Sequence, residues 1–158
     1  MNGRIVALDV GEKRIGVAAC DPSGIVVRTA GVVQAEPRER ALNELQRIVA
    51  DEEAVLVLVG LPLTLRGEQG PQAQRVMAFV DALRAVISVP FEFRDERFTS
   101  VEAERIIEER GGKRRKKDSR NKQRGEIDQV AASLILQDYL NEQQIQRARP
   151  AYDDDLLP

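Results

Sequence analysis

Apolar residues gather in short runs at the start of the chain. Residues 4–10 are almost continuously apolar up to Asp9, which is typical of a central strand buried on both faces. Residues 14–20 and 25–33 form two further apolar runs, and the turn-forming residues 21–24 separate them. The connections are too short to hold crossover helices, so the pattern predicts an antiparallel meander of three strands.

Beyond residue 36 the apolar positions change to helical spacing, interrupted by short strands. The predicted helices cover about residues 37–50, 71–87, 99–111 and 126–143, and the predicted strands cover 55–59 and 90–94. Thr99 with Glu102 fits a capping box at the start of the third helix. A meander followed by alternating helices and strands predicts an α/β fold, with a mixed five-stranded sheet flanked by helices.

Charge is distributed unevenly along the 158 residues. The segment 111–125 has a net charge of +7, whereas the rest of the chain has a net charge of −9. Its basic residues are Lys113, Arg114, Arg115, Lys116, Lys117, Arg120, Lys122 and Arg124. Such a run favours a polyanionic partner, and we interpret it as a mobile loop that binds phosphates. A solvated loop without a ligand is the alternative.

Neither an internal repeat nor a linker divides the chain. We therefore expect a single domain over residues 1–143 that contains the basic loop, and a poorly ordered tail over residues 144–158. Charged residues interrupt the first apolar run, and no run approaches the ~18 apolar residues of a membrane span. The single cysteine, Cys20, excludes an internal disulfide. We expect a cytoplasmic protein without a membrane partner.

The composition also limits the chemistry of any active site. The chain has no histidine, which excludes histidine acid–base catalysis, Ser-His-Asp triads and histidine-bound zinc within it. One cysteine is too few for a thiolate zinc cluster. A metal site would need oxygen ligands, which favours Mg²⁺ or Mn²⁺.

Two carboxylates stand at positions where a purely structural role is costly. Asp9 ends a buried strand, where an ionised side chain needs a partner or a metal. In the last helix, steps of three, four, seven and eleven residues from Asp128 reach only apolar or amphipathic side chains, so Asp128 lies on the face that packs against the sheet. An ordinary turn at Asp9 and an ordinary helix start at Asp128 are the alternatives.

A third acid follows the strand 90–94, and the pattern leaves its identity open. Strand alternation separates Asp95 from Glu96, but a turn at this point would reset the alternation. Three carboxylates gathered at a sheet would suit a two-metal site that hydrolyses phosphodiester bonds. Arg66, in the loop after the strand 55–59, would reach a phosphate, although a plain strand-to-helix turn explains that loop equally well.

Four ordered motifs resemble the YqgF/RuvX family over about residues 3–141. They are Asp9-Val-Gly-Glu-Lys-Arg-Ile-Gly-Val-Ala18, Gly60-Leu-Pro-Leu63 with Gly67, Asp95-Glu-Arg-Phe-Thr-Ser100, and Asp128-Gln-Val-Ala-Ala132 with Ile135-Leu-Gln137 and Tyr139-Leu140. Members of this family are described as Holliday junction resolvases and as nucleases of pre-16S rRNA. The family has an RNase H-like fold, which the resemblance implies here.

The resemblance also implies roles for individual residues. It favours Asp9, Glu96 and Asp128 as catalytic and metal-binding residues, with Asp95 or Glu126 as a fourth carboxylate. It places Lys13, Arg14, Arg97 and Thr99 near the site, where they join Arg66 and the basic loop in binding nucleic acid. Cys20 departs from the serine usual in the family, and nothing follows from this change.

Three function classes compete on these grounds. The first is a metal-dependent endonuclease, acting most naturally on four-way DNA junctions, with precursor rRNA as the alternative. A junction resolvase would act as a homodimer, because it must cut two symmetric strands. The second is a nucleic-acid-binding module without catalysis. The third, an actin-like phosphotransferase, needs two such domains and does not fit 158 residues.

Overall fold

A computed structural model describes residues 3–96 and 119–148, and the side chains of the last helix from residue 126 onward. Its strands are β1 (Arg4–Val10), β2 (Arg14–Cys20), β3 (Val27–Gln34), β4 (Ala54–Leu61) and β5 (Phe91–Asp95). They form one five-stranded sheet in the order β3-β2-β1-β4-β5. The first three strands pair antiparallel, whereas β4 and β5 run parallel to β1. The predicted mixed sheet and its meander are confirmed.

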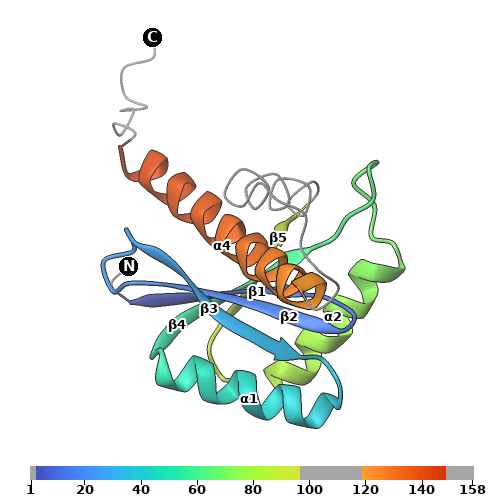
Figure 1. The fold of residues 1–158 in the computed structure, drawn as a ribbon. Coiled ribbons are helices and arrows are strands. Elements are labelled where there is room, and N and C mark those ends of the chain that lie inside the picture. The colour runs from blue at the N-terminus through green and yellow to red at the C-terminus, as the bar shows by residue number, and fades with distance from the viewer. Residues whose placement is uncertain (1–2, 97–118, 149–158) are drawn as a thin grey trace.

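Helices cover both faces of this sheet (Figure 1). The helices α1 (Arg38–Asp51) and α2 (Pro71–Arg84) lie on one face, and α4 (Ser119–Ala148) crosses the other. The side chains of β1 alternate between two apolar clusters because successive residues of a strand point to opposite faces. Val6 and Leu8 face α1 and α2, whereas Ile5 and Ala7 face α4. The same alternation directs Asp9 toward α4.

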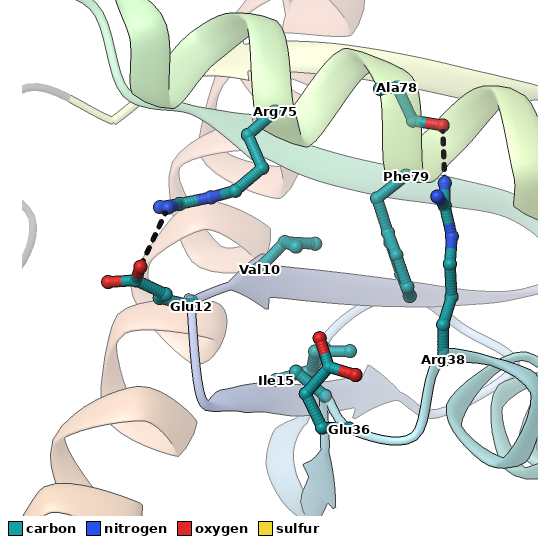
Figure 2. A pocket seen from close by; sticks show the side chains of 10 residues that line it. Val10, Glu12, Ile15, Glu36, Arg38, Arg75, Ala78 and Phe79 are labelled. Carbon is teal, nitrogen blue, oxygen red and sulfur yellow. Dashed lines mark hydrogen bonds and ion pairs between the residues drawn. The ribbon is translucent and has the colours of Figure 1, made fainter.

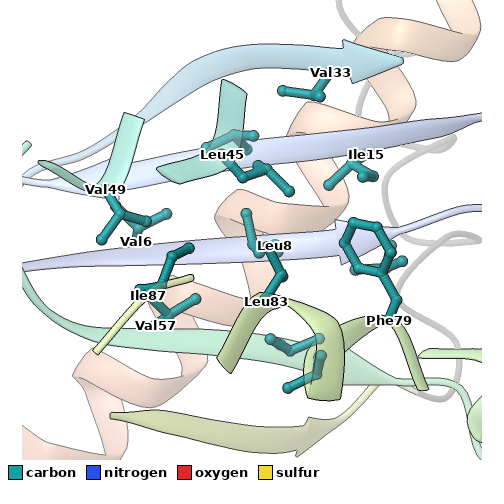
Figure 3. Close-up of a cluster of buried hydrophobic side chains, with 14 of the residues drawn as sticks. Val6, Leu8, Ile15, Val33, Leu45, Val49, Val57, Phe79, Leu83 and Ile87 are labelled. Carbon is teal, nitrogen blue, oxygen red and sulfur yellow. The ribbon is translucent and has the colours of Figure 1, made fainter. Parts of the chain in front are cut away.

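The larger core lies between the sheet and the helices α1 and α2 (Figure 3). Leu8 and Ile15 from the central strands meet Leu45 of α1 and Leu83 of α2, and all four are almost completely buried. Buried apolar side chains contribute roughly 1.5–3 kcal/mol each, so this core fixes the sheet as a rigid support. None of the described helices is long and apolar enough to cross a membrane.

The beginning of β3 differs from the prediction. The apolar run 25–33 predicted a strand from residue 25, but the strand begins at Val27. The carboxylate of Asp21 accepts hydrogen bonds from the backbone N–H groups of Ile25 and Val26, at 2.8 and 2.9 Å. These two residues therefore belong to the turn, and their side chains are 66% and 61% exposed.

The last helix is longer than the predicted 126–143 and spans Ser119–Ala148. Residues 119–125, assigned above to the mobile basic loop, and residues 144–148, assigned to the poorly ordered tail, are therefore helical. Both extensions are mostly polar, so they show no apolar periodicity, but they are rich in Arg, Lys and Gln, which favour helices. Elongating a helix that packing already holds costs little. The rest of both segments, and the predicted helix 99–111, lie outside the described residues.

Candidate active site

Asp9 lies at the C-terminal end of β1, in the middle of the sheet. It is 9% exposed and is the one buried charged side chain in the part of the chain that the structure describes. Burial raises the pKa of its carboxyl group to about 6, because the charged form loses its hydration; the charge of Asp128 raises it further, and a hydrogen bond with Glu96 partly opposes the shift.

Glu96 follows β5 directly and meets Asp9. Its backbone N–H donates to the carbonyl of Leu61 at 3.2 Å, which fixes the chain where it leaves the sheet. Its carboxyl group is hydrogen-bonded to that of Asp9, and burial, together with the charge of Asp9, raises the pKa of Glu96 to about 9. Two carboxylates in contact repel each other when both are ionised, so the pair holds a proton at neutral pH.

Asp128 stands on the face of α4 that packs against the sheet. Ala131, Ala132, Ile135 and Tyr139, which share this face, are all buried, as the helical spacing predicted. Arg14 of β2 donates its Nε–H to Oδ2 of Asp128 at 3.0 Å. Burial raises the pKa of Asp128, while Arg14 partly opposes the rise. Asp128 therefore faces the Asp9–Glu96 pair from the helix that covers this side of the sheet. The guanidinium group of Arg14 in β2 holds it in that position.

Two glycines make room for these acids. A Cβ atom at Gly60, in β4, would lie 2.3 Å from Oε2 of Glu96 and 2.6 Å from Cδ1 of Ile135. A Cβ atom at Gly16, in β2, would lie 2.0 Å from the backbone oxygen of Asp128. Sequence analysis gave neither glycine a role, although a glycine inside an apolar strand is the usual sign of such a close approach.

The residues present fit a divalent cation. Burial, together with the charges of neighbouring acids, raises the pKa values of these two adjoining carboxyl groups, and a bound cation would offset both effects. Their oxygen atoms are the donors that Mg²⁺ and Mn²⁺ prefer. Within residues 3–96 and 126–148, however, no three acidic or thiol side chains are grouped closely enough to hold a metal together. A centre of three carboxylates stays a prediction, since Asp128 is bonded to Arg14.

The structure describes only some of the other predicted site residues. Lys13 is exposed in the β1–β2 turn and Arg66 is exposed in the β4–α2 loop. Arg120, Lys122 and Arg124 belong to the start of α4, where only the backbone is described. Arg97, Thr99, Lys113, Arg114, Arg115, Lys116 and Lys117 lie outside the described residues.

The two suggested fourth carboxylates are both exposed. Asp95 is exposed at the end of β5, and its charge contributes to the raised pKa of Glu96. It also lines an open pocket with Asp138 and Glu142 of α4. Glu126 is exposed on α4. A role for either in metal binding stays a prediction.

A second pocket, of about 160 Å³, opens on the other face of the sheet (Figure 2). Glu12, in the turn after β1, forms an ion pair of 3.4 Å with Arg75 of α2. Arg38 of α1 donates to the carbonyl of Ala78 at 3.0 Å. Both partners of the ion pair are well exposed, so it contributes little to stability. The ion pair joins the turn after β1 to α2, and the hydrogen bond joins α1 to α2.

Comparison with known proteins shows which protein family the chain belongs to. A family model described as "RuvX: Holliday junction resolvase" matches residues 3–142. The chain belongs to the RuvX family. The match covers all of the carboxylates and glycines described above, so the family named by the sequence motifs is confirmed.

Curated relatives of this RuvX protein carry a different description. A protein of Chloroflexus aggregans is 49% identical over 87% of this chain and 92% of its own length. A protein of Roseiflexus sp. strain RS-1 is 45% identical over 89% of this chain and 96% of its own length. Both are named "Putative pre-16S rRNA nuclease".

Solved structures show the fold of the RuvX chain. RuvC of T. thermophilus, in complex with a Holliday junction substrate, superposes with a TM-score of 0.53 at 14% identity, over 89% of this chain and 96% of that one. The fowlpox virus resolvase bound to Holliday junction DNA gives 0.51 at 16% identity, over 89% and 98%. At these identities the likeness concerns the fold alone, and it confirms the RNase H-like, RuvC-like architecture.

The two glycines lead to a prediction that distinguishes a loss of folding stability from a loss of Mn²⁺ binding. Gly60→Ala presses on the movable end of Glu96, whereas Gly16→Ala presses on the backbone of α4. We expect Gly16→Ala to cost about 1–3 kcal/mol of unfolding free energy, and Gly60→Ala to cost less while weakening Mn²⁺ binding. Urea denaturation and Mn²⁺ titration measure both, with Thr29→Ala, exposed in β3, as the control. Equal stability losses with unchanged Mn²⁺ binding would contradict the assignment of Gly60.

The raised pKa values predict how stability depends on pH in the absence of metal. Because the folded state holds protons more tightly than the unfolded state, the stability that the carboxyl pair contributes is fully present below its ordinary pKa values of 3.8 and 4.5. It is lost as pH rises from there through the folded pKa values of about 6 and 9. Asp9→Asn removes one of the two charges. We expect it to be more stable than wild type at pH 8 by on the order of 2 kcal/mol, and equally stable or less stable at pH 5.

Urea denaturation in a chelating buffer at several pH values measures this effect. Asp51→Asn, on the exposed end of α1, is the matched control and should follow the wild-type curve. Parallel curves for wild type and Asp9→Asn from pH 5 to 9 would show that the carboxyl pair is not under electrostatic strain.

Proposed function

We propose that this RuvX protein is a metal-dependent endonuclease that hydrolyses phosphodiester bonds in structured nucleic acid, with the precursor of 16S rRNA as its substrate. The observation that carries the proposal is the buried contact between the carboxyl groups of Asp9 and Glu96 beside Asp128. Burying two acids together is unfavourable for folding, and such strained carboxyl groups gather at catalytic sites.

Asp9, Glu96 and Asp128 are the residues that would hold Mg²⁺ or Mn²⁺. When bound, such a cation neutralises charge on the phosphate and lowers the pKa of an attacking water. The carboxyl pair gives up its shared proton as it becomes a ligand, which couples metal binding to pH. Arg14 orients Asp128 through its bond to Oδ2, and so sets where the third carboxylate stands.

Nucleic acid would approach along the edge of the sheet where β1, β4 and β5 end. Lys13 and Arg66 are exposed at this edge, in the connections that follow β1 and β4. Phosphate contacts of this kind position a backbone without reading its sequence. The basic segment 111–125 precedes Asp128 in the chain, and we assign it the role of a phosphate clamp. The expected cytoplasmic location fits this role.

The relatives give precursor rRNA priority over a DNA junction. Proteins 49% and 45% identical to this chain are named for pre-16S rRNA, whereas the junction-bound structures share only 14% and 16% identity with it. A four-way DNA junction stays the second candidate because the family model itself is described as a resolvase. That substrate requires a homodimer, since two symmetric strands must be cut.

The proposal predicts metal-dependent cleavage that depends on the carboxyl pair. A precursor rRNA fragment, a four-way DNA junction and a linear duplex are incubated with Mn²⁺, Mg²⁺ or EDTA. We expect the RNA to be cut in either metal and not in EDTA, with a loss of about 100-fold or more in Asp9→Asn and Glu96→Gln. Glu39→Gln, exposed in the first turn of α1, should cut as wild type does.

Other outcomes point elsewhere. Symmetric nicking of the junction alone, by a protein that is dimeric in solution, would favour the resolvase. Salt-sensitive binding without cleavage, unchanged in Asp9→Asn, would leave a nucleic-acid-binding module and defeat the catalytic assignment.

A further inference from the structure

Leu65 is the most exposed large apolar side chain in the described part of the chain. It is 79% exposed, in the loop that joins β4 to α2. Single exposed apolar residues are common on protein surfaces and need no explanation by themselves. Leu65 differs because its loop is built to hold it outward, and because the loop starts beside the carboxyl pair.

The far end of the loop is a tight turn with Leu65 and Arg66 at its tip. The N–H of Gly67 donates to the carbonyl of Thr64 at 2.8 Å, and the N–H of Thr64 donates to the carbonyl of Glu68 at 2.9 Å. The side-chain oxygen of Thr64 accepts a third bond, 3.0 Å long, from the N–H of Glu68. Gly67 has a φ of +80°, a conformation that glycine adopts without strain. The tip is therefore fixed in shape before any ligand arrives.

A leucine is not what the turn itself requires. Asn, Asp, Ser, Gly and Pro favour the central positions of such turns, because they suit the backbone or bond to it. Leu65 makes none of the three bonds that hold the turn together. Its exposed apolar surface is instead unfavourable in water, and a ligand that covered it would remove that surface from water.

The base of the loop is joined to the candidate active site. The carbonyl of Leu61, where β4 ends, accepts the N–H of Glu96 at 3.2 Å. Leu61 and Leu63 pack into the larger core, which anchors the loop at its start. From there the loop projects beyond the edge of the sheet (Figure 1). A substrate held at Asp9 and Glu96 that extends past the ends of these strands would therefore meet the tip.

The side chains at the tip indicate which kind of ligand it would bind. Apolar side chains inserted between bases unstack them and bend the nucleic acid, and a neighbouring arginine contacts phosphate. Arg66 supplies that cation, while Glu68 offsets its charge, so attraction of the whole loop to phosphate is weak. The apolar contact of Leu65 is then the main interaction that the tip offers.

We propose that Leu65 is a wedge that enters between bases at a branched or unpaired step beside the scissile phosphate, and that Arg66 contacts the adjoining phosphate. This inference rests on the proposed nuclease function and adds the structural feature that the enzyme recognises. Branched and unpaired steps are preferred because their bases are already partly unstacked, which lowers the energy needed to insert a side chain.

Fluorescence of 2-aminopurine tests the wedge without cleavage. The fluorophore is placed at the branch of a four-way DNA junction and at the stem–strand boundary of an RNA hairpin, and protein is added in EDTA. We expect wild type to raise the fluorescence of at least one probe, and Leu65→Ser to lose most of that rise. Ile25→Ser, equally apolar and exposed at another turn, should behave as wild type.

Kinetics in Mn²⁺ complete the test. We expect Leu65→Ser to lower kcat/KM on the branched or unpaired substrate by about tenfold or more and to leave the salt dependence of binding unchanged. Arg66→Gln should reduce the slope of log affinity against log salt by about one unit. The urea midpoint of Leu65→Ser should equal that of wild type, since the side chain is exposed; a clear fall would show a structural role and overturn the wedge.

Different results would refute the proposed wedge and the proposed nuclease activity. Wild-type cleavage that requires Asp9, with Leu65→Ser equal to wild type in fluorescence and in rate, would overturn the wedge and leave the nuclease. A fluorescence rise that requires Leu65, from a protein that cuts no substrate, would support the contact with bases and overturn the nuclease.

Discussion

The carboxyl groups of Asp9 and Glu96 lie in hydrogen-bond contact where water has little access, and the rest of the structure has to support that contact. Two acids placed together lose hydration and repel each other when ionised, so the arrangement opposes folding in the absence of a cation. It persists because the sheet around it is held by a core on each face. In the proposed nuclease, a bound cation would relieve this strain.

Several elements serve this one contact. The central strand β1 brings Asp9 to the end of the sheet where the parallel strands finish, and the parallel pairing of β4 and β5 brings the chain after β5 to the same end. Gly60 leaves space for the Glu96 carboxyl group, and Gly16 lets α4 approach closely enough to present Asp128. Arg14 then holds Asp128 at a fixed position. A site supported from several elements in this way keeps its geometry before the metal or substrate arrives.

Much of this could be predicted from sequence, for identifiable physical reasons. Asp9 and Asp128 interrupt strong apolar patterns, and the structure places both where those patterns predicted. Glu96 could not be separated from Asp95 by pattern, because the chain leaves the strand between them. The pairing of Arg14 with Asp128, far away in the chain, depends on tertiary packing that no local pattern encodes. The turn at Ile25 and Val26 escaped prediction because the Asp21 carboxylate, rather than hydrophobicity, decides their conformation.

Calorimetric titration with Mn²⁺ tests the central claim most directly, because it asks whether the carboxyl pair binds metal at all. In buffers of different ionisation enthalpy near pH 7, wild type should bind Mn²⁺ and release about one proton as the pair ionises. Asp9→Asn and Glu96→Gln should each lose measurable binding, while Asp51→Asn retains it. Mn²⁺ binding of wild-type strength in both pair variants, without proton release in wild type, would contradict the account and make the buried pair a structural feature.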